Sequence, residues 1–474
     1  MKIFDGLRPL QTAEFLMMVL LAAAIPLHWF AAQCGEAGLL LCAVLKLVFD
    51  QKFHLNKEQL KFKWAYIVFA MTWLVYFVGM IYTDNQSEGW VQVTKKLGFL
   101  IFPVIFIFSD MSYITKDRFR AICYAFVAGC ILFFLMNLCY AFYDVIFNNA
   151  TSERFFDRGL MKIYHVHHSY MSMYAGLGLM FCFLEIFGNN NRKVKVFNVS
   201  AYITLVIFII LLSSRAGLIC LVFLFVIQWI WLYFIIKKKK MGLIMGCVFF
   251  FALVGMPTVF NNSFSRITET VYNLTENKSD KRYIQFKGYS QVLMDNWFFG
   301  VGTGDRSDEI EKSYQEYLDK VVDVLGIQIR DAIDEIYSTC YTCEIDSLRV
   351  MIVENADKYG YDSDFVCEQL VDYIFIQDAI YKNKNAHNMY FETLISVGIV
   401  GLLLLFAYFV IPVVLWIKTR NFDILYFTFL FIIAFNALFE SLFEVQMGII
   451  FFCFFNALLF KMNFIGVEST KNNE

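Results

Sequence analysis

The sequence predicts an all-α, polytopic integral membrane protein with about twelve transmembrane helices and one large external, partly helical loop. Of its 474 residues, 59% are hydrophobic, 19% are aromatic and only 17% are charged. Apolar runs long enough to cross a bilayer recur along the chain, and Lys and Arg gather in alternate links between them. A soluble chain could not cover so much apolar surface, so a water-soluble fold is excluded.

Windows of about 17–25 apolar residues place the predicted spans. They start near Glu14, Ala37, Trp64, Leu97, Ala121, Ser169, Asn198, Gly217, Met241, Met389, Asp423 and Leu442. Four regions follow from these spans. They are a membrane domain at 1–260, a large periplasmic loop at 261–388, a second membrane part at 389–462 and a cytoplasmic tail at 463–474.

The basic residues predict the orientation of the chain. Lys237–Lys240, Lys418 and Arg420 lie in links that the span order places on one side, together with the basic residues of the other even-numbered links. Cytoplasmic links carry an excess of Lys and Arg. We therefore expect both termini in the cytoplasm and the 261–388 loop on the outer side of the membrane.

The large loop shows helical patterning in two places. A helix is expected from Lys281-Arg282-Tyr283 to Trp297. Apolar residues then recur at helical spacing from Tyr314 to Leu325 and again from Val366 to Ile374. These segments predict two or three amphipathic helices that cap the membrane domain.

Charge composition argues against a nucleic-acid partner, and cysteine spacing argues against a zinc site but leaves a disulfide open. The net charge is −2 and no basic tract resembles a nucleic-acid footprint. Cys340 and Cys343 form a C-x-x-C in the loop, near Cys367, but a fourth zinc ligand is missing. An oxidising exterior would permit a disulfide among these cysteines, and the sequence does not decide whether one forms.

Outward-facing arginines are the first candidate for chemistry. Arg215 lies in the short link Ser213–Gly217 between two spans, and Arg282 begins the expected loop helix. Guanidinium groups bind diphosphate oxygens in pairs. Arg266 and Lys281 are candidate substrate contacts in the same loop. The alternative is that Arg215 is an interfacial arginine whose side chain simply reaches water.

Histidines form the second candidate. His387 precedes the span that starts at Met389, where an imidazole can exchange protons and still meet a lipid-anchored substrate. Asn388 and Tyr390 adjoin it as candidate substrate contacts. The alternative is a structural histidine bonded to a nearby carbonyl.

The segment Tyr164–Tyr170 contains His165, His167 and His168 at the outer end of the sixth span. Clustered histidines suggest a metal, but no Cys or paired carboxylate stands nearby in the sequence. We therefore predict no metal site. His167, His168 and Tyr170 are instead candidates for substrate contact, with helix capping as the structural alternative.

Two further features complete the candidates. Glu440 and Glu444 stand one helical turn apart at the start of the last span, where carboxylates are costly unless paired. We expect them to support Arg215 or Arg282. The run Trp297–Gly304 contains G-x-G-x-G but lacks the strand-loop-helix context of a nucleotide loop. A tight turn beside Trp297, itself a candidate substrate contact, is the better interpretation.

Together these residues resemble the O-antigen ligase family. His387-Asn388, nine residues, and then Gly398-Ile399-Val400-Gly401 is similar to the family's H-N-x9-G-x-x-G signature. Supporting elements follow in the family's order over roughly residues 60–460. They are Tyr82–Asn85, Lys95–Leu97, His168–Tyr170, Ser214–Gly217, Arg282 with Trp297 and Gly300–Gly302, and Glu440–Gly448. The acidic segment between Gly304 and Asn385 is long for the family.

The resemblance implies a glycosyltransferase of the bacterial inner membrane that needs neither metal nor nucleotide and whose active site faces the periplasm. Its donor would be a glycan on undecaprenyl diphosphate, and its acceptor the lipid A-core, another glycan or a protein hydroxyl. Arg215 and Arg282 would stabilise the diphosphate, and His387 would take the acceptor's proton.

Three alternatives to O-antigen ligase remain. The nearest is a polymerase of the same family. A lipid-linked glycan flippase is a different class, but transporters usually show inverted repeats and charged or broken helices near the midplane, and neither is visible here. A sensor or scaffold is the third. The oligomeric state is not predicted.

Overall fold

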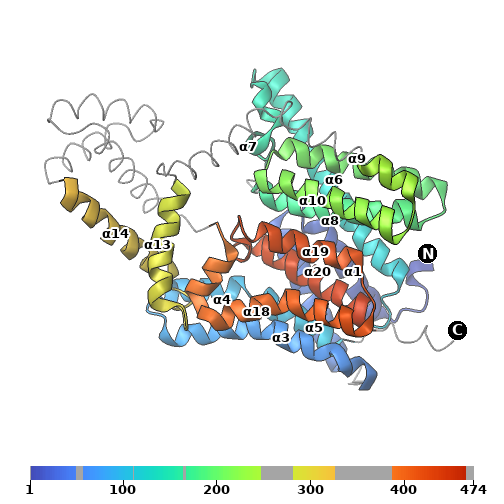
Figure 1. Ribbon diagram of the computed structural model, residues 1–474. Coiled ribbons are helices and arrows are strands. Elements are labelled where there is room, and N and C mark those ends of the chain that lie inside the picture. The colour runs from blue at the N-terminus through green and yellow to red at the C-terminus, as the bar shows by residue number, and fades with distance from the viewer. Residues whose placement is uncertain are drawn as a thin grey trace. The chain divides into compact units, whose positions relative to one another are not determined.

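The described part of the chain is helical. A computed structural model describes residues 2–49, 57–109, 111–163, 167–246, 281–325 and 387–465 (Figure 1). No strand occurs among these residues, so the all-α prediction is confirmed. The chain divides into two compact units. Unit 1 comprises Met1–Val75, Gln92–Phe264 and Leu403–Glu474, and unit 2 comprises Tyr76–Val91 and Ser265–Leu402.

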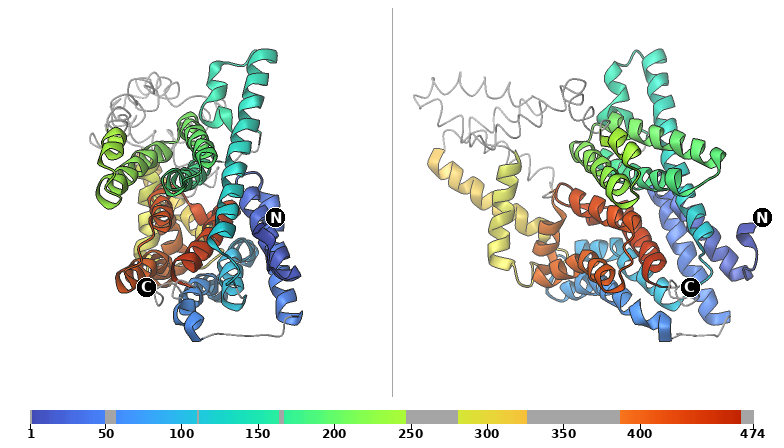
Figure 2. Two further views of the ribbon diagram at one scale, coloured as in Figure 1. Left: turned by 90° about the vertical axis from the view of Figure 1, so that its right-hand side faces the viewer. Right: turned by 45° about the vertical axis from the view of Figure 1, so that its right-hand side comes forward.

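Unit 1 is a bundle of apolar helices. Its elements are η1 (Lys2–Phe4), α1 (Pro9–Ala24), α2 (Trp29–Phe49), α5 (Gly98–Phe108), α6 (Lys116–Phe147), η3 (Ser152–Phe155), α7 (Asp157–Leu160), α8 (His168–Gly188), α9 (Arg192–Leu212), α10 (Arg215–Ile230), the π-helical turn η4 (Trp231–Ile235), α19 (Ile424–Asn436), η5 (Leu442–Glu444) and α20 (Gln446–Phe464). Helices α8, α9 and α10 lie side by side, and α1 lies along α6 (Figure 2).

Unit 2 contains η2 (Met80–Tyr82), α13 (Lys281–Asn296) and α14 (Arg306–Leu325). Helices α13 and α14 pack against each other (Figure 1). Three helices run from one unit into the other, namely α3 (Lys57–Gly79), α4 (Gln86–Lys95) and α18 (Met389–Thr419). The helices expected from Lys281 and around Tyr314 are therefore confirmed as α13 and α14, whereas 366–374 lies outside the described residues.

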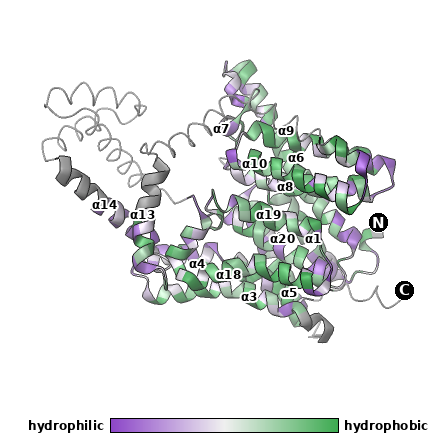
Figure 3. Cartoon of the chain, in the orientation of Figure 1, coloured by the Kyte–Doolittle hydropathy of each residue, from purple (hydrophilic) through white to green (hydrophobic). Residues whose placement is uncertain are grey.

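The predicted membrane spans correspond to helices. Within the described ranges, 9 helices are long and apolar enough to cross a membrane, and Pro9–Ala24 and Ile424–Asn436 are shorter apolar helices. The colouring of Figure 3 shows that the residues of these helices are largely hydrophobic. The span expected near Met241 continues past residue 246, outside the described residues. The total of about twelve, the regional boundaries and the orientation stay predictions.

Phenylalanine forms the core of unit 1. Helix α20 packs on α2, α5 and α19, and nearly all of its residues are buried. Phe126 of α6 lies 4.7 Å from Phe455, measured between ring centroids, and Tyr174 of α8 lies 4.4 Å from Phe451. Such aromatic pairs add to the packing that holds helices together in lipid, where the hydrophobic effect between helices is lost. This packing holds α6 and α8 against α20.

Candidate functional site

A break in helix α18 organises unit 2. Val397 and Gly398 have non-helical backbone angles, and Gly398 has a φ of 68°. In an intact helix the Ile399 N–H would donate to the Ile395 carbonyl. Instead, the Ile399 N–H donates to Trp297 O at 3.0 Å, and Ile395 O accepts from the Val301 N–H at 2.7 Å. The turn after α13 thus takes over the hydrogen bonds that the helix gives up.

The turn and the break fit because glycines allow close contact. The Gly302 N–H donates to Ser396 O at 3.1 Å. A Cβ on Gly300, whose φ is 76°, would lie 2.6 Å from the Ile395 carbonyl oxygen, and a Cβ on Gly398 would collide with the Phe298 carbonyl. The tight-turn interpretation of Trp297–Gly304 is therefore confirmed. Since the N–H groups of Val301 and Gly302 already serve the helix break, they are not available to cradle a phosphate.

A second segment ties this turn to the end of α3. The Asp305 carboxylate accepts from the backbone N–H groups of Asp84 at 2.8 Å and Asn85 at 2.6 Å. The Thr303 hydroxyl donates to Tyr76 O at 2.6 Å. Asp305 also begins α14, because its carbonyl accepts from the Glu309 N–H. Hydrogen bonds thus bring together three sequence elements of the resemblance, namely Tyr82–Asn85, Gly300–Gly302 and Gly398–Gly401.

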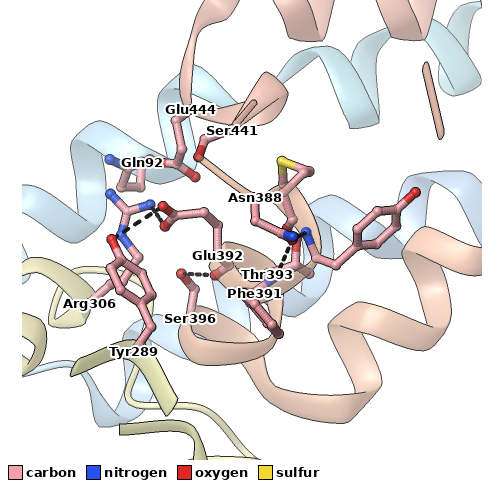
Figure 4. A network of polar contacts seen from close by, with 12 residues as sticks. Gln92, Tyr289, Arg306, Asn388, Phe391, Glu392, Thr393, Ser396, Ser441 and Glu444 are labelled. Carbon is pink, nitrogen blue, oxygen red and sulfur yellow. Dashed lines mark hydrogen bonds and ion pairs between the residues drawn. The ribbon is translucent and has the colours of Figure 1, made fainter. Parts of the chain in front are cut away.

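A buried ion pair joins α14 to α18. The Arg306 guanidinium donates to the Glu392 carboxylate, and Glu392 is fully buried. Tyr289 of α13 reaches the same carboxylate at 3.5 Å, and the Ser396 hydroxyl donates to the Glu392 carbonyl at 2.8 Å (Figure 4). A carboxylate at the start of an apolar helix requires such partners. The pair fixes the first turns of α18 against the α13–α14 hairpin.

Tyr314 fills the interface between α13 and α14. It is 1% exposed, and a Cβ on Gly288 would lie 2.5 Å from its ring. Burial, and to a lesser degree the Glu392 carboxylate, raise the pKa of the Tyr314 phenol. The phenol therefore stays neutral, and its oxygen has no hydrogen-bond partner among the described residues.

His387 and Asn388 lie where α18 begins. The Asn388 side-chain oxygen accepts from the N–H groups of Tyr390 at 3.0 Å and Phe391 at 3.1 Å, so it caps the helix (Figure 4). His387 is half-buried and has a φ of 48°. Positive φ is uncommon outside glycine, and the cap holds the next residue in place. Two other predicted site residues of this unit are fully described. Tyr390 is half-buried and Trp297 is exposed.

In unit 1, a chain of hydroxyl groups leads from Glu440 to the start of α10. The Ser169 hydroxyl donates to Glu440 Oε1 at 2.8 Å and lies 3.2 Å from the Ser214 hydroxyl. Since a carboxylate only accepts, Ser169 uses its proton on Glu440 and Ser214 donates to Ser169. Ser214 is also the N-cap of α10, accepting from the Gly217 N–H. Arg215, half-buried, is the first residue of that helix.

Glu444 has a cationic partner that the sequence interpretation did not name. Lys96 Nζ lies 3.1 Å from Glu444 Oε1 and donates to Gln92 Oε1 at 2.8 Å. Lys96 is 1% exposed and Glu444 8%. A buried lysine and glutamate stabilise each other's charge, and the amide of Gln92 supplies a further acceptor. The pair ties the junction of α4 and α5 to η5.

The two described histidines of the predicted cluster stack on each other. The ring centroids of His167 and His168 are 4.3 Å apart. His167 Nδ1 lies 3.6 Å from Glu440 Oε1, and His168 Nδ1 lies 3.4 Å from Asp157 Oδ1. Tyr170 donates to the Ser441 carbonyl at 3.3 Å. The predicted group of His167, Tyr170 and Glu440 is therefore brought together in unit 1, beside the start of α10.

Some predicted residues fall at or beyond the limits of the description. Arg266 and His165 lie outside the described residues, as do Cys340, Cys343 and Cys367. Lys281 and Arg282 begin α13, with their side chains outside the described part. Within the described ranges, no group of His, Cys, Asp and Glu could hold a metal ion. The roles predicted for these residues stay predictions.

Fold and side chains define a class: a polytopic helical membrane protein with buried charged and hydroxyl groups at helix ends. A family model described as O-antigen ligase matches residues 200–324. This match confirms the predicted resemblance to the O-antigen ligase family over the matched residues, and the members of that family are glycosyltransferase-like enzymes. The matched stretch contains Arg215 and Arg282 and ends before His387. No match was found among curated proteins.

Sequence reasoning missed Arg306, Glu392 and Tyr289, and it named Lys96 only as part of a motif. A signal existed for Glu392 and Lys96, since each is a charged residue within a candidate span and charged side chains there need partners. Arg306 gave no such signal. It stands 86 residues from Glu392 in a segment rich in charge.

Replacing Gly398 tests the docking of the turn on the helix break. We expect Gly398→Ala to lower the apparent melting temperature, because the backbone angles of Gly398 (φ 68°, ψ −165°) lie in a region almost restricted to glycine, where another residue costs about 1–3 kcal/mol, and because the added methyl displaces the Phe298 carbonyl. Differential scanning fluorimetry in detergent measures it. Gly188→Ala is the control, since a Cβ there meets nothing within 4 Å. Equal melting temperatures for wild type and Gly398→Ala would contradict the described docking.

Replacing Arg306 tests the buried ion pair. Arg306→Ala leaves the Glu392 carboxylate buried without its cation, a change that typically costs about 3–5 kcal/mol. The double variant Arg306→Met with Glu392→Leu removes both charges and should recover most of the melting temperature. Lys312→Ala breaks an exposed pair with Glu309 and should change little. A double variant no more stable than Arg306→Ala would show that the two charges are not coupled.

Proposed function

We propose that the protein transfers a glycan from an undecaprenyl diphosphate carrier to an acceptor hydroxyl at the periplasmic face of the inner membrane. The lipid A-core is the first acceptor to consider, as for an O-antigen ligase. The observation that carries this proposal is the family match at 200–324, which includes both Arg215 and Arg282. The apolar spans agree with a donor and a product that both remain in the membrane.

The reaction has one bond made and one bond broken. The acceptor oxygen attacks the anomeric carbon of the glycan, and the bond from that carbon to the carrier's diphosphate breaks. The bonding electrons leave with the diphosphate, whose negative charge grows in the transition state. Fixed guanidinium groups stabilise such charge. We assign this role to Arg215 and Arg282.

The position of Arg215 supports this assignment. Its backbone lies at the first residue of α10, where the helix dipole favours an anion. The contacts from Ser214 through Ser169 to Glu440 restrain this helix end. An interaction that stabilises a transition state is most effective when its groups are already in place, because no reorganisation is then needed.

His387 is assigned the proton transfer. It would accept the proton of the attacking hydroxyl as the new bond forms. Support comes from its place at the start of α18, where the Asn388 cap and the Arg306–Glu392 pair restrain the backbone that carries it. Arg266, Lys281, His167, His168, Tyr170, Asn388, Tyr390, Trp297, Glu440 and Glu444 remain proposed substrate contacts or supports of such contacts.

The glycans of a strain that lacks this gene distinguish ligase from polymerase. We expect lipid A-core without attached O-chains, with long chains left on the carrier. A core capped by a single repeat unit would assign the chain as a polymerase instead. Core without O-chains, with the carrier-linked glycan left on the cytoplasmic side, would favour a flippase and overturn the proposal.

Substituting His387 tests the proposed base. His387→Ala should lower the transfer rate by about 10²- to 10⁴-fold, the usual contribution of general-base catalysis. Binding of the carrier-linked donor should persist, since the arginines hold the diphosphate. His28→Ala, which removes a histidine from the link between α1 and α2, is the control. Transfer by a well-expressed His387→Ala at the wild-type rate would assign the proton to another group.

Lysine substitutions test the arginines. Arg215→Lys and Arg282→Lys keep the charge but remove the planar pair of donors, and each should lose most of the transfer activity. Arg192→Lys is the matched control, because Arg192 is also the first residue of a helix but is exposed. Turnover and donor binding are measured together. Near-normal turnover in both variants would favour interfacial arginines that do not act on the diphosphate.

A further inference from the structure

Three adjacent aromatic side chains project from the turn of unit 2. Trp297 is 54% exposed, Phe298 49% and Phe299 68%, whereas Gly302–Asp305, which follow, are buried. The ring of Phe298 contacts those of Trp297 and Phe299 edge to face, with centroids 5.4 Å and 4.7 Å apart respectively. We call Trp297–Phe299 the aromatic turn. Its side chains form a contiguous apolar projection, which a water-soluble surface rarely carries.

Hydrogen bonds hold the backbone of the aromatic turn in place. Phe299 O accepts from the Tyr82 hydroxyl at 2.7 Å. Phe298 O accepts from the Ile399 N–H at 3.2 Å, which also donates to Trp297 O. The three carbonyls therefore accept from Ile399 at the break in α18 and from Tyr82 at the end of η2. The turn is docked through its backbone carbonyls, and its three aromatic rings remain exposed.

Helix lengths place the aromatic turn at a membrane boundary. From Gly398 to Thr419, helix α18 rises about 33 Å at 1.5 Å per residue, close to the hydrocarbon thickness of about 30 Å. The candidate span Phe62–Tyr82 has 21 residues and ends at the residue that binds Phe299. The aromatic turn therefore contacts two membrane-spanning helical segments at the point where each segment ends.

The apolar surface of these helices continues onto the turn. Ile81 is 83% exposed and Val400 46%, and both lie within two residues of groups that bind the turn. Hydrocarbon is the environment expected around such side chains in a span. Tryptophan is enriched where spans meet the headgroups. Exposed apolar side chains thus continue from the spans to the aromatic turn.

We propose that the aromatic turn inserts into the bilayer leaflet at this boundary and is covered by lipid acyl chains just below the headgroups. It anchors the end of α13 and the start of α14 to the membrane. Because the same turn binds the break in α18, it also sets the height of His387 above the membrane. This inference is independent of the proposed glycosyl transfer.

Fluorescence quenching tests the insertion. An environment-sensitive nitrobenzoxadiazole label is attached to Phe298→Cys, and separately to Glu311→Cys on the exposed side of α14, in a background without the native cysteines. The protein is reconstituted into phosphatidylethanolamine–phosphatidylglycerol vesicles. We expect a blue-shifted emission at 298, quenched strongly by lipids with a nitroxide near the headgroup, less by those with a nitroxide at the chain end, and weakly by iodide. The label at 311 should respond to iodide alone.

Two results would overturn the proposal. Strong iodide quenching at 298 without nitroxide quenching would place the turn in water. Protection from both quenchers would show that protein, such as a second copy of the chain, covers it. A second measurement avoids the cysteine-free background. Benzoylphenylalanine at position 298 of the otherwise unaltered chain should give lipid adducts on irradiation, and adducts to peptide alone would contradict lipid contact.

Discussion

The constraint on which unit 2 depends is the need to satisfy backbone groups where α18 breaks at Gly398. In or near lipid, a backbone N–H or carbonyl without a hydrogen-bond partner lowers the stability of the fold by several kcal/mol, roughly as in other apolar surroundings. The turn after α13 supplies partners for the Ile399 N–H and for the carbonyls of Ile395 and Ser396. Once docked, that turn fixes Asp305 at the start of α14, and with it Arg306. The Arg306–Glu392 pair then returns to α18 and restrains the segment after His387.

In unit 1, side chains rather than a backbone turn supply the partners for polar groups at helix ends. The start of α10, which carries Arg215, is capped by Ser214 and connected through Ser169 to Glu440. Close by along the chain, Glu444 is neutralised by Lys96. The phenylalanine core around α20 holds these helix ends in place. The unit thereby presents an arginine on a rigid helix end, a requirement for electrostatic stabilisation of a transition state.

Much of the fold could be predicted because hydropathy and helix periodicity are local properties of the chain. The spans and helices α13 and α14 were found this way. The sequence also indicates the glycine turn at Trp297–Gly304 and the G-x-x-G at Gly398–Gly401, but it does not indicate that the two segments contact each other. Their contact depends on tertiary packing between Gly300 and Gly398, which no local pattern encodes. The same holds for Arg306 with Glu392, and for the serines that connect Arg215's helix to Glu440, where carboxylate–arginine pairing had been expected.

The central claim is that fixed side chains of this protein carry out glycosyl transfer from a lipid diphosphate. The most direct measurement uses purified protein in vesicles with carrier-linked glycan and acceptor, in excess EDTA and without nucleotide. The account predicts that the glycan moves to the acceptor and that free carrier diphosphate appears in equal amount. Transfer that occurs only after a divalent metal or a nucleotide is added would contradict it.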